Sequence, residues 1–262
     1  MGEGRVVLWR YAFGQSTGSS HEKLGKPCQD RLACATADAD ATLIAVVADG
    51  AGTAGLAHIG AEIAVATVTS IAQLGVRAGR TDYPEILREG ATLARHRLVE
   101  AAAERKAEPR DLACTLLAVI IAPIGGGALQ IGDGVIVIGE QPLSWRWLFW
   151  PQKGEYANTT FFLSDEKSLA NAEVGPLPDE VLDVALMSDG LEPLALQFAK
   201  RAAHEPFFRT VLAPLHAAAN NGEAAALSAG LNSLLASPAV RSRTDDDASL
   251  VIATRRSPAP GR

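Results

Sequence analysis

The chain has 262 residues, of which 48% are hydrophobic, and a formal net charge of −6. This length and composition suit one large domain or two small ones with an ample core. Acidic and basic residues are interspersed without a basic block, which argues against nucleic acid as a partner. The longest apolar run, LLAVIIAPI at residues 116–124, is too short to cross a bilayer, and the N-terminus lacks a signal-peptide core. We therefore expect no membrane association.

Cysteine is rare in this chain. Cys28, Cys34 and Cys114 are too few for a disulfide framework, and none forms a C-x-x-C pair. No cluster of cysteine and histidine has the ligand spacing of a structural zinc site. This usage predicts reduced thiols in a cytoplasmic protein.

The apolar patterns predict strands first, then helices, then strands again. Strands are expected at 5–14, 31–36, 42–48, 113–122, 128–140, 159–164 and 248–256. Helices are expected at 57–76 and 83–106, followed by a helical stretch at 191–236 that is broken at Pro206, Pro214 and Gly222. This grouping indicates an α+β fold with helical layers outside sheet layers, because alternating β-α-β units are absent. The tail 257–262, SPAPGR, is predicted to be disordered.

Aspartate followed by glycine recurs at the ends of apolar segments. LIAVVADG ends in Asp49 and Gly50, ALQIGDG contains Asp133, and DVALMSDG ends in Asp189. Further acids stand before apolar strands: Asp30 in KPCQDRLA, and 245–247 in TDDDASLVIA. A single Asp-Gly after a strand is usually a turn, and Asp133-Gly134 also suits a two-residue hairpin.

Taken jointly, these acids indicate a metal site. Carboxylates gathered at strand ends would repel one another and raise their pKa values. No Arg or Lys adjoins Asp49, Asp133 or Asp189 in the sequence to neutralise them. Mg²⁺ and Mn²⁺ prefer oxygen ligands, and a glycine after the acid lets its carbonyl approach a cation. The pattern therefore predicts an oxygen-ligated metal site, and a binuclear one would suit attack of a bound hydroxide on phosphorus.

The ordered motifs resemble those of the metal-dependent type 2C protein serine/threonine phosphatases, in their compact bacterial branch. The motifs that carry the resemblance are GSSHEKLGKPCQDR, VVADGAG, ACTLLAVI, QIGDGVIVI, GEYANTTFFLS, ALMSDGLEPLA and DDDASLVIA. They span about residues 14–254 in the order typical of that family. The resemblance implies a four-layer α/β/β/α sandwich, with two antiparallel sheets flanked by helices, as a single domain over residues 1–256.

The resemblance also implies a set of site residues around two or three Mn²⁺ or Mg²⁺ ions. Asp49 resembles the carboxylate that bridges two metals, and the Gly50 carbonyl resembles a ligand of one of them. Asp189 and Asp246 resemble ligands of the other, with Asp246 preferred to Asp247 because Ser249 then fits the family pattern. Asp30 resembles the acid of the N-terminal motif, and Asp133 resembles the group linked to a third metal. Asp49, Asp189 and Asp30 are the expected catalytic residues.

Three positions depart from the family pattern. Gln29 stands where many relatives have Glu, and Ala51 stands where eukaryotic members have His. No Arg stands a few residues before Asp30, where the family usually has a phosphate-binding Arg, so Lys23 and Lys26 are the candidate substrate-binding cations, with the alternative that they are surface lysines. His21 is a further substrate-binding candidate, or else a residue that orders the N-terminal loop.

The implied activity is hydrolysis of phosphoserine and phosphothreonine by a metal-activated water. The implied partners are phosphoproteins of a Ser/Thr kinase, and we expect a monomer. A catalytically weak module that binds phosphoproteins remains the alternative, because of Gln29 and Ala51. Hydrolysis of small phosphoesters is a third, weaker alternative for the function. The aromatic segment 141–162 either covers the sandwich as a strand or docks the phosphoprotein.

Overall fold

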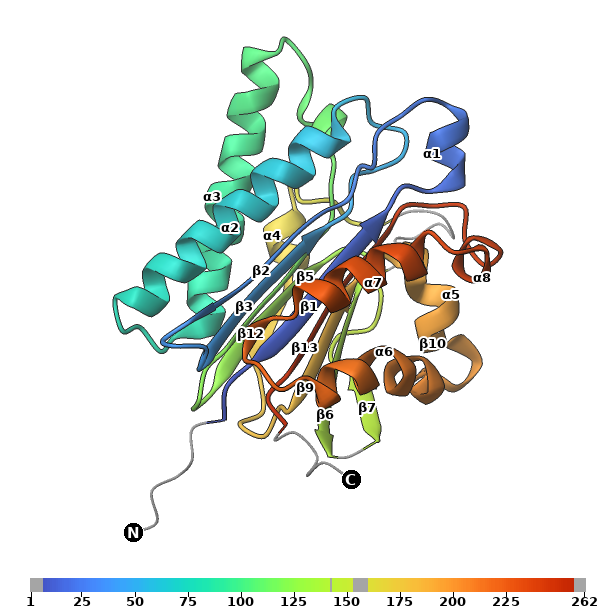
Figure 1. The fold of residues 1–262 in the computed structure, drawn as a ribbon. Helices are drawn as coiled ribbons and strands as arrows, with labels where there is room; N and C mark the ends of the chain where they lie inside the picture. Colours follow the sequence, from blue (N-terminus) through green and yellow to red (C-terminus); the bar gives the residue numbers. More distant parts are fainter. Residues whose placement is uncertain (1–6, 142, 153–159, 257–262) are drawn as a thin grey trace.

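The computed structural model describes residues 7–141, 143–152 and 160–256. Two β-sheets pack face to face, and helices cover both outer faces (Figure 1). One sheet has the order β12 (Gly222–Glu223), β1 (Arg10–Ser16), β13 (Ala248–Thr254), β9 (Asp183–Met187), β6 (Val135–Gln141) and β7 (Ser144–Trp147). The other has the order β2 (Arg31–Ala37), β3 (Thr42–Ala48), β4 (Leu116–Ile121), β5 (Gly126–Ile131) and β8 (Glu173–Pro176). All their pairings are antiparallel except that of β1 with β12.

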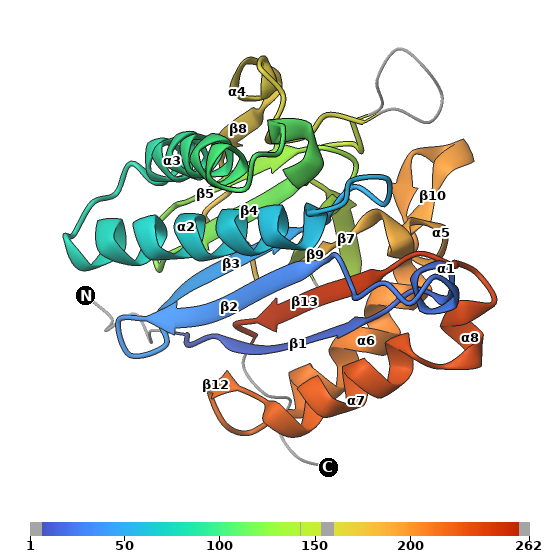
Figure 2. The same cartoon turned by 90° about the horizontal axis from the view of Figure 1, so that it is seen from above.

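The helices form the two outer layers. The long helices α2 (Ala57–Arg77) and α3 (Tyr83–Glu104) cover the five-stranded sheet, while α6 (Glu205–Ala217) and α7 (Ala225–Leu235) cover the six-stranded one (Figure 2). Short elements complete the described chain: α1 (Ser19–Lys23), η1 (Pro109–Leu112), α4 (Ser168–Asn171), η2 (Asp189–Leu191), α5 (Glu192–Ala195), β10 (Leu196–Gln197), η3 (Phe198–Lys200), β11 (Ala202–Ala203) and α8 (Pro238–Arg241). The predicted four-layer α/β/β/α sandwich is confirmed.

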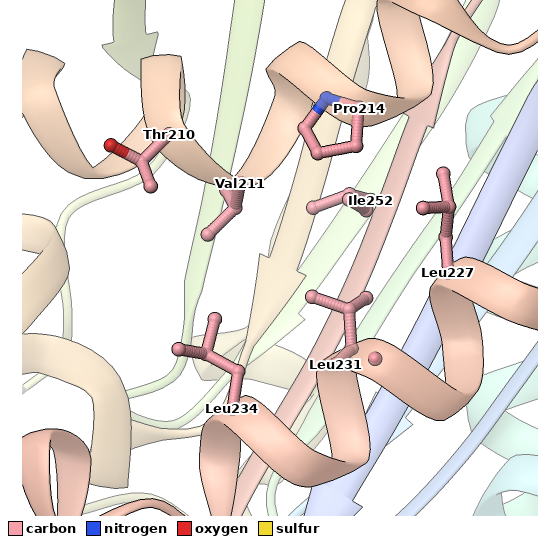
Figure 3. Close-up of a pocket in the computed structure, with 8 residues that line it drawn as sticks. Thr210, Val211, Pro214, Leu227, Leu231, Leu234 and Ile252 are labelled. Atoms are coloured by element: carbon pink, nitrogen blue, oxygen red, sulfur yellow. The ribbon is translucent and has the colours of Figure 1, made fainter.

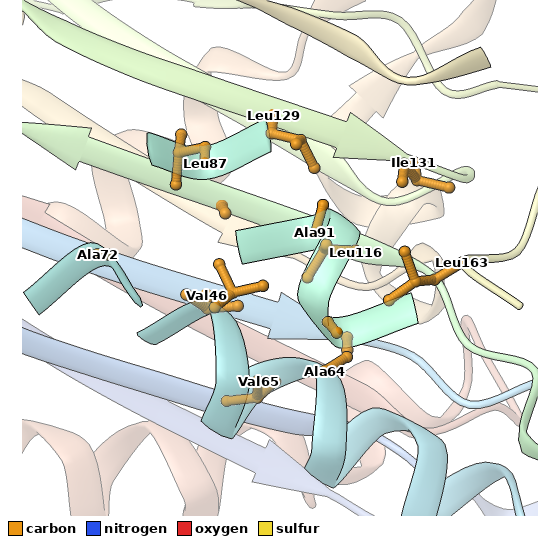
Figure 4. Packing of buried hydrophobic residues seen from close by; sticks show 14 of the residues in the cluster. Val46, Ala64, Val65, Ala72, Leu87, Ala91, Leu116, Leu129, Ile131 and Leu163 are labelled. Carbon is orange, nitrogen blue, oxygen red and sulfur yellow. The ribbon is translucent and has the colours of Figure 1, made fainter. Parts of the chain in front are cut away.

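Strand β3 contributes side chains to two hydrophobic cores, one between its sheet and the helices and one between the two sheets. All seven of its residues are buried, as the continuous apolar run predicts. Ile44 and Val46 pack toward α2 and α3 in the cluster that Figure 4 shows, whereas Leu43 and Val47 pack between the two sheets. Because successive side chains of a strand point to opposite faces, both faces of β3 must be apolar.

Helix α2 owes its apolar character to this same core. By length and composition it could cross a membrane, and half of its most apolar window is buried inside the protein. Ala61, Ala64 and Val68 are almost fully buried against the sheet and α3. Because α2 packs against both the sheet and α3, its high hydropathy is explained by burial inside the protein and does not require a membrane-spanning helix.

The loop at Asp133 and Gly134 is not a hairpin. It leaves β5 of the five-stranded sheet and enters β6 of the six-stranded sheet, so it crosses between the two sheets. Gly132 has a φ of 102°, a conformation that side chains disfavour, and this glycine allows the chain to change direction there.

Two further predictions of local structure are wrong. In the described part of the predicted strand 159–164, no residue is in a strand. Leu163 is instead a buried anchor whose N–H donates to the carbonyl of Cys114 at 2.7 Å. Helix α6 starts at Glu205, so the helical stretch is interrupted just before Pro206 as expected, but the helix continues through Pro214 instead of breaking there. Its buried face, which includes Phe208 and Leu212, outweighs the hydrogen bond that a proline removes.

The aromatic segment mainly packs against the protein. Trp145, Trp147 and Trp150 are partly buried against the core beneath α6 and α7. The indole N–H of Trp147 donates to the carbonyl of Arg201 at 2.7 Å. These contacts match the interpretation of a strand whose aromatics cover the sandwich. Residues 153–159 of this segment, with part of the GEYANTTFFLS motif, lie outside the described residues, as does the tail 257–262.

Candidate functional site

The topology gathers the predicted acids at one end of the sandwich. Asp30 directly precedes β2, and Asp49 directly follows β3, which runs antiparallel to β2. In the other sheet, Asp189 follows β9 and Asp246 comes just before β13, and these two strands are again antiparallel neighbours. Asp133 lies in the crossover from the end of β5 to the start of β6, at the same end. Antiparallel pairing therefore brings together residues that are far apart in the chain.

Asp49 lies at the centre of the acids. Burial, followed by the nearby charges of Asp30 and Asp189, raises its pKa well above the ordinary value. Burial likewise raises the pKa of Asp30 to about 7, against the lowering effect of hydrogen bonds. Neither group has a Lys or Arg ion pair among the described residues. These carboxylates therefore lack the compensating charge that a buried acid ordinarily requires.

Close packing explains the glycines that follow two of the acids. A Cβ at Gly50 would come within 2.8 Å of the Cβ of Ala57 and within 2.9 Å of the carbonyl oxygen of Gln29. A Cβ at Gly190 would lie 2.0 Å from the carbonyl oxygen of Asp247. Glycine is needed at both positions because neighbouring atoms approach its backbone too closely for a side chain.

The structure gives Asp246 and Asp247 different roles. Asp246 is exposed at the rim, and partial desolvation followed by the charge of Asp189 raises its pKa. Asp247 is 1% exposed, and its carboxylate accepts hydrogen bonds from the N–H of Gly18 at 2.7 Å and that of Gln29 at 2.6 Å. Asp247 is therefore committed to holding loops together, whereas Asp246 faces the other acids.

His21, Lys23 and Lys26 lie in the N-terminal segment beside these loops. His21 is buried, and its Nδ1 lies 2.9 Å from Oδ2 of Asp247, so it orders the loop. Lys26 reaches the rim, where its Nζ donates to the carbonyl of Gly52 at 3.0 Å. Lys23 is exposed on the short helix α1. Of these three predicted substrate-binding residues, Lys26 is the cation that the structure brings against the Asp49 loop.

Gln29, the residue that replaces a family glutamate, is 2% exposed. Its Nε2 donates to the carbonyl of Ala54 at 3.3 Å, and its Oε1 is buried without a hydrogen-bond partner. Ala51 is fixed by its backbone, whose N–H donates to the carbonyl of Ala113. A neutral amide oxygen is thus available here in place of a carboxylate.

Sequence reasoning missed two supporting residues. Ser188 Oγ donates to Oδ2 of Asp30 at 2.8 Å and accepts the N–H of Ser249 at 3.0 Å, which ties the two sheets together. Thr115 Oγ1 accepts the N–H of Asp49 at 3.0 Å and thereby fixes the end of β3. Both lie inside motifs of the family resemblance, SDG and ACT, but their spacing gives no sign of these long-range contacts.

The donor set fits a hard divalent cation. Oδ1 of Asp30 and Oδ1 of Asp189 are buried without a hydrogen-bond partner, and oxygen is what Mg²⁺ and Mn²⁺ prefer. The interactions are pairwise: Asp49 with Asp30, Asp49 with Asp189, and Asp189 with Asp246. In the described ranges, no group of three His, Cys, Asp or Glu side chains is arranged so that it could hold a metal ion. The roles of the individual ligands therefore stay predictions.

An apolar cavity elsewhere does not match this chemistry. It has a volume of about 240 Å³ and lies between α6 and α7 over β13 (Figure 3). Its lining includes Val211, Leu231, Leu234 and Ile252 but none of the predicted site residues. It offers no carboxylate for a cation and no positive charge for a phosphate.

Comparison with known proteins gives the family. Residues 17–236 match the family described as Protein phosphatase 2C. The chain is 34% identical to Serine/threonine-protein phosphatase 3 of Escherichia coli (strain K12), over 94% of this chain and 98% of that protein. Among solved structures it resembles PppA, a key regulatory component of T6SS in Pseudomonas aeruginosa, with 19% identity, coverage of 95% and 98%, and a TM-score of 0.64. It also resembles serine/threonine phosphatase Stp1 from Staphylococcus aureus, with 13% identity, coverage of 96% and 95%, and a TM-score of 0.60.

The two structural likenesses bear on the fold, and they agree with the four-layer sandwich. The family match spans most of the chain, and the Escherichia coli relative is matched over nearly its whole length. The acids at the end of the sandwich lie in the motifs that carried the resemblance. The chain belongs to the protein phosphatase 2C family.

Proposed function

We propose that this protein hydrolyses phosphoserine and phosphothreonine in protein substrates at a centre of two Mn²⁺ or Mg²⁺ ions. The observation that carries the proposal is the group of acids drawn from both sheets, with buried, unpartnered oxygens on Asp30 and Asp189. The protein phosphatase 2C family is generally metal-dependent, and the relative from Escherichia coli is named as a serine/threonine-protein phosphatase.

Asp49 would be shared between the ions, since it interacts with Asp30 on one side and Asp189 on the other. The Gly50 carbonyl and Asp246 would complete the ligands from the protein, and Asp133 would serve a weaker third ion. When bound, such ions supply positive charge that lowers the pKa of a bound water and polarises a phosphate.

Other residues of the chain hold these ligands in position. Ser188 orients the carboxylate of Asp30, and Thr115 fixes the backbone of Asp49. Lys26 at the rim supplies a positive charge for the incoming phosphate group, while His21 maintains the loop through Asp247. Preorganised ligands of this kind need little rearrangement when substrate binds.

The cellular setting is proposed on sequence grounds. Three free thiols support a cytoplasmic location, and a net charge of −6 without a basic block argues against nucleic acid as a partner. Phosphoproteins of a Ser/Thr kinase are the partners that membership of the family supports. We propose that the protein acts as a monomer, away from the membrane.

A turnover assay tests the function. We expect a phosphothreonine peptide to be hydrolysed with Mn²⁺ and not with excess chelator. Asp49→Asn and Asp189→Asn should each lower kcat by more than about a hundredfold, beyond the 10–100-fold typical of groups that only support ligands. Asp245→Asn is the matched control, because Asp245 is an exposed acid in the same loop as Asp246.

The outcomes separate the candidate functions. Near-normal turnover by Asp49→Asn would contradict the metal site. Binding of the phosphopeptide without any turnover would favour a binding module, in which Gln29 and Ala51 have weakened the chemistry. Turnover of a small aryl phosphate with none of the peptide would favour a small-phosphoester hydrolase.

A further inference from the structure

Strand β2 is the open edge of the five-stranded sheet. Each of its seven residues is partly exposed, whereas every residue of the neighbouring strand β3 is buried. Exposure of one face would alternate along the strand, because successive side chains point to opposite faces. Uniform exposure indicates that solvent reaches the backbone edge itself.

The register identifies the backbone groups that point outward. The N–H of Thr115 donates to the carbonyl of Asp49, so odd-numbered residues of β3 direct their backbone groups toward β4 and even-numbered ones toward β2. The even-numbered residues of β3 pair with odd-numbered residues of β2. Leu32, Cys34 and Thr36 therefore direct their N–H and C=O groups away from the sheet. Within the described ranges these groups have no hydrogen-bond partner.

The comparable edge of the other sheet is closed. The N–H of Phe13 in β1 donates to Ser228 Oγ at 3.2 Å, and that of Gln15 donates to Asn232 Oδ1 at 2.9 Å, both from α7. Strand β12 pairs with the remainder of β1. In the part of the chain that the structure describes, strand β2 has no such cover, and the strand contains no proline and no bulge in its register with β3. Proteins ordinarily protect an edge of this length, so an unprotected one is suited to pairing with another chain.

A groove runs beside this edge. Its volume is about 380 Å³, and its lining includes Arg31 and Ala33 of β2 with Glu62, Val65, Ala66 and Ser70 of α2. A strand added to β2 would direct every second side chain toward α2 and hence into the groove. Main-chain pairing and side-chain pockets are thus available together.

The open edge leads into the candidate metal site. Asp30 immediately precedes β2, so the first outward position, Leu32, is about 7 Å along the chain from it at roughly 3.3 Å per residue. Arg31 fixes this connection, because its Nη1 donates to the carbonyls of Cys28 at 2.8 Å and Asp30 at 2.6 Å. At the far end of β2, Gly222 lies near the side chain of Asp40, which belongs to the turn that follows the strand. The outward position next to the acids is therefore Leu32.

We propose that the edge of β2 binds an extended segment of the phosphoprotein substrate as an added strand. The segment flanks the phosphorylated residue, which then lies at the acids beyond Leu32. This inference rests on the proposed function, since the occupant is chosen by the continuity of the edge with the phosphate-hydrolysing site. A second copy of this chain, paired edge to edge, is the competing occupant.

A backbone-modified peptide series tests the proposal on the unaltered protein. One phosphothreonine peptide of about ten residues is prepared with a single N-methyl group at each successive amide. Strand pairing uses every second N–H, so kcat/KM should fall roughly five- to tenfold at alternate positions and stay within about twofold at those between. A uniform effect, or none, along the series would overturn the proposal.

A variant pair tests the same edge from the side of the enzyme. Cys34→Pro removes one outward N–H at a place where an edge strand tolerates proline, and Cys34→Ala keeps that N–H. Cys34→Pro should lower kcat/KM for the peptide roughly fivefold, whereas its kcat/KM for a small aryl phosphate should change by less than about twofold. Cys34→Ala should match the wild type on both substrates. Equal values for the two folded variants would count against the added strand. If Cys34→Pro does not fold, the N-methyl series decides.

The remaining outcomes separate this inference from the function. If light scattering detects a dimer that Cys34→Pro dissociates, while the peptide series is flat, the edge is a self-interface and the proposal fails. If the aryl phosphate and the unmodified peptide are both hydrolysed, but N-methylation has the same effect or none at every position, only the added-strand proposal is overturned. No hydrolysis of either substrate with Mn²⁺ would overturn the proposed function and the docking together.

Discussion

Asp247 has more influence on the candidate site than its place in a run of three acids indicates. It is 1% exposed and accepts hydrogen bonds from the backbone of Gly18 and Gln29 and from His21. These contacts join the start of β13 to the N-terminal loop and to the residue before Asp30. A charged acceptor with three donors is a strong buried interaction, because each donor would otherwise be left unsatisfied.

Replacement of Asp247 should therefore affect stability first. We expect Asp247→Ala to lower the free energy of unfolding by about 3 kcal/mol, since it leaves buried donors unpaired. Urea unfolding followed by circular dichroism measures this change. Asp245→Ala is the control because Asp245 is exposed, and it should change the free energy by less than about 0.5 kcal/mol. Equal effects of the two variants would contradict the role assigned to Asp247.

Single residues also show where sequence reasoning stops. The family resemblance alone favours Asp246 over Asp247 as a ligand, and the structure adds a reason, since Asp247 is already engaged. The contacts of Ser188 with Asp30 and Ser249 span 158 and 61 residues. No local pattern indicates such pairs, because they depend on how two sheets stack.

At the scale of elements, Asp183 ties together β9, β13 and α6 at its end of the six-stranded sheet. Its carboxylate is fully buried and accepts hydrogen bonds from Thr254 Oγ1 at 2.7 Å, Arg256 Nε at 2.8 Å and His216 Nε2 at 2.9 Å. Burial alone would raise the pKa of Asp183, but the hydrogen bonds from His216 and Thr254, with the positive charges nearby, outweigh it and lower the pKa. The charged form is thus the one that the fold stabilises.

This shift predicts how stability depends on pH. The pKa of Asp183 is lower in the folded than in the unfolded chain, where it is about 3.9. The carboxylate therefore contributes stability in full above about pH 4, and that contribution is lost as the pH falls through the lowered value. We expect Asp183→Asn to reduce the free energy of unfolding by about 3 kcal/mol at pH 7 and by less near pH 3.

Urea unfolding at the two pH values checks this prediction. Glu140→Gln is the control, because its ion pair with Arg146 is partly exposed and should contribute less than about 1 kcal/mol. A deficit in Asp183→Asn that does not shrink in acid would show that the lost contacts, rather than the charge, carry the effect.

Elements with strong periodicity could be predicted from the sequence. Strand β3 and helices α2 and α3 lie within one or two residues of their expected bounds. The prediction fails where the tertiary environment overrides local signals. Pro214 remains inside α6 because that helix buries an apolar face, and the loop at Asp133 crosses between sheets because its two strands belong to different layers.

At the scale of the whole molecule, the candidate site spans both sheets. Asp30 and Asp49 belong to the five-stranded sheet, and Asp189 and Asp246 to the six-stranded one. A cation held between them would link the two halves of the sandwich and remove the repulsion between buried acids. Binding to the folded state alone stabilises a protein by RT ln(1 + [L]/Kd).

Mn²⁺ should therefore raise the thermal stability of the whole protein. We expect a gain of about 2.7 kcal/mol in unfolding free energy when free Mn²⁺ is a hundred times its Kd. In excess chelator, Asp49→Asn should be at least as stable as the wild type, because one repelling buried charge is gone, and added Mn²⁺ should stabilise it much less. Calorimetry measures both effects independently of activity. Equal stabilisation of the two proteins by Mn²⁺ would place the cation elsewhere.

The sequence by itself determined the apolar periodicity, and with it most strands, the long helices and the acids at strand ends. These follow from local rules, since a strand buried on both faces must be apolar throughout and a loop acid can be recognised beside glycine. The tertiary structure alone decided which sheet each strand joins, which of two adjacent acids is engaged and which sheet edge remains open. Those outcomes depend on pairing between distant segments, whose free energy becomes available only when the two sheets and their helices pack together.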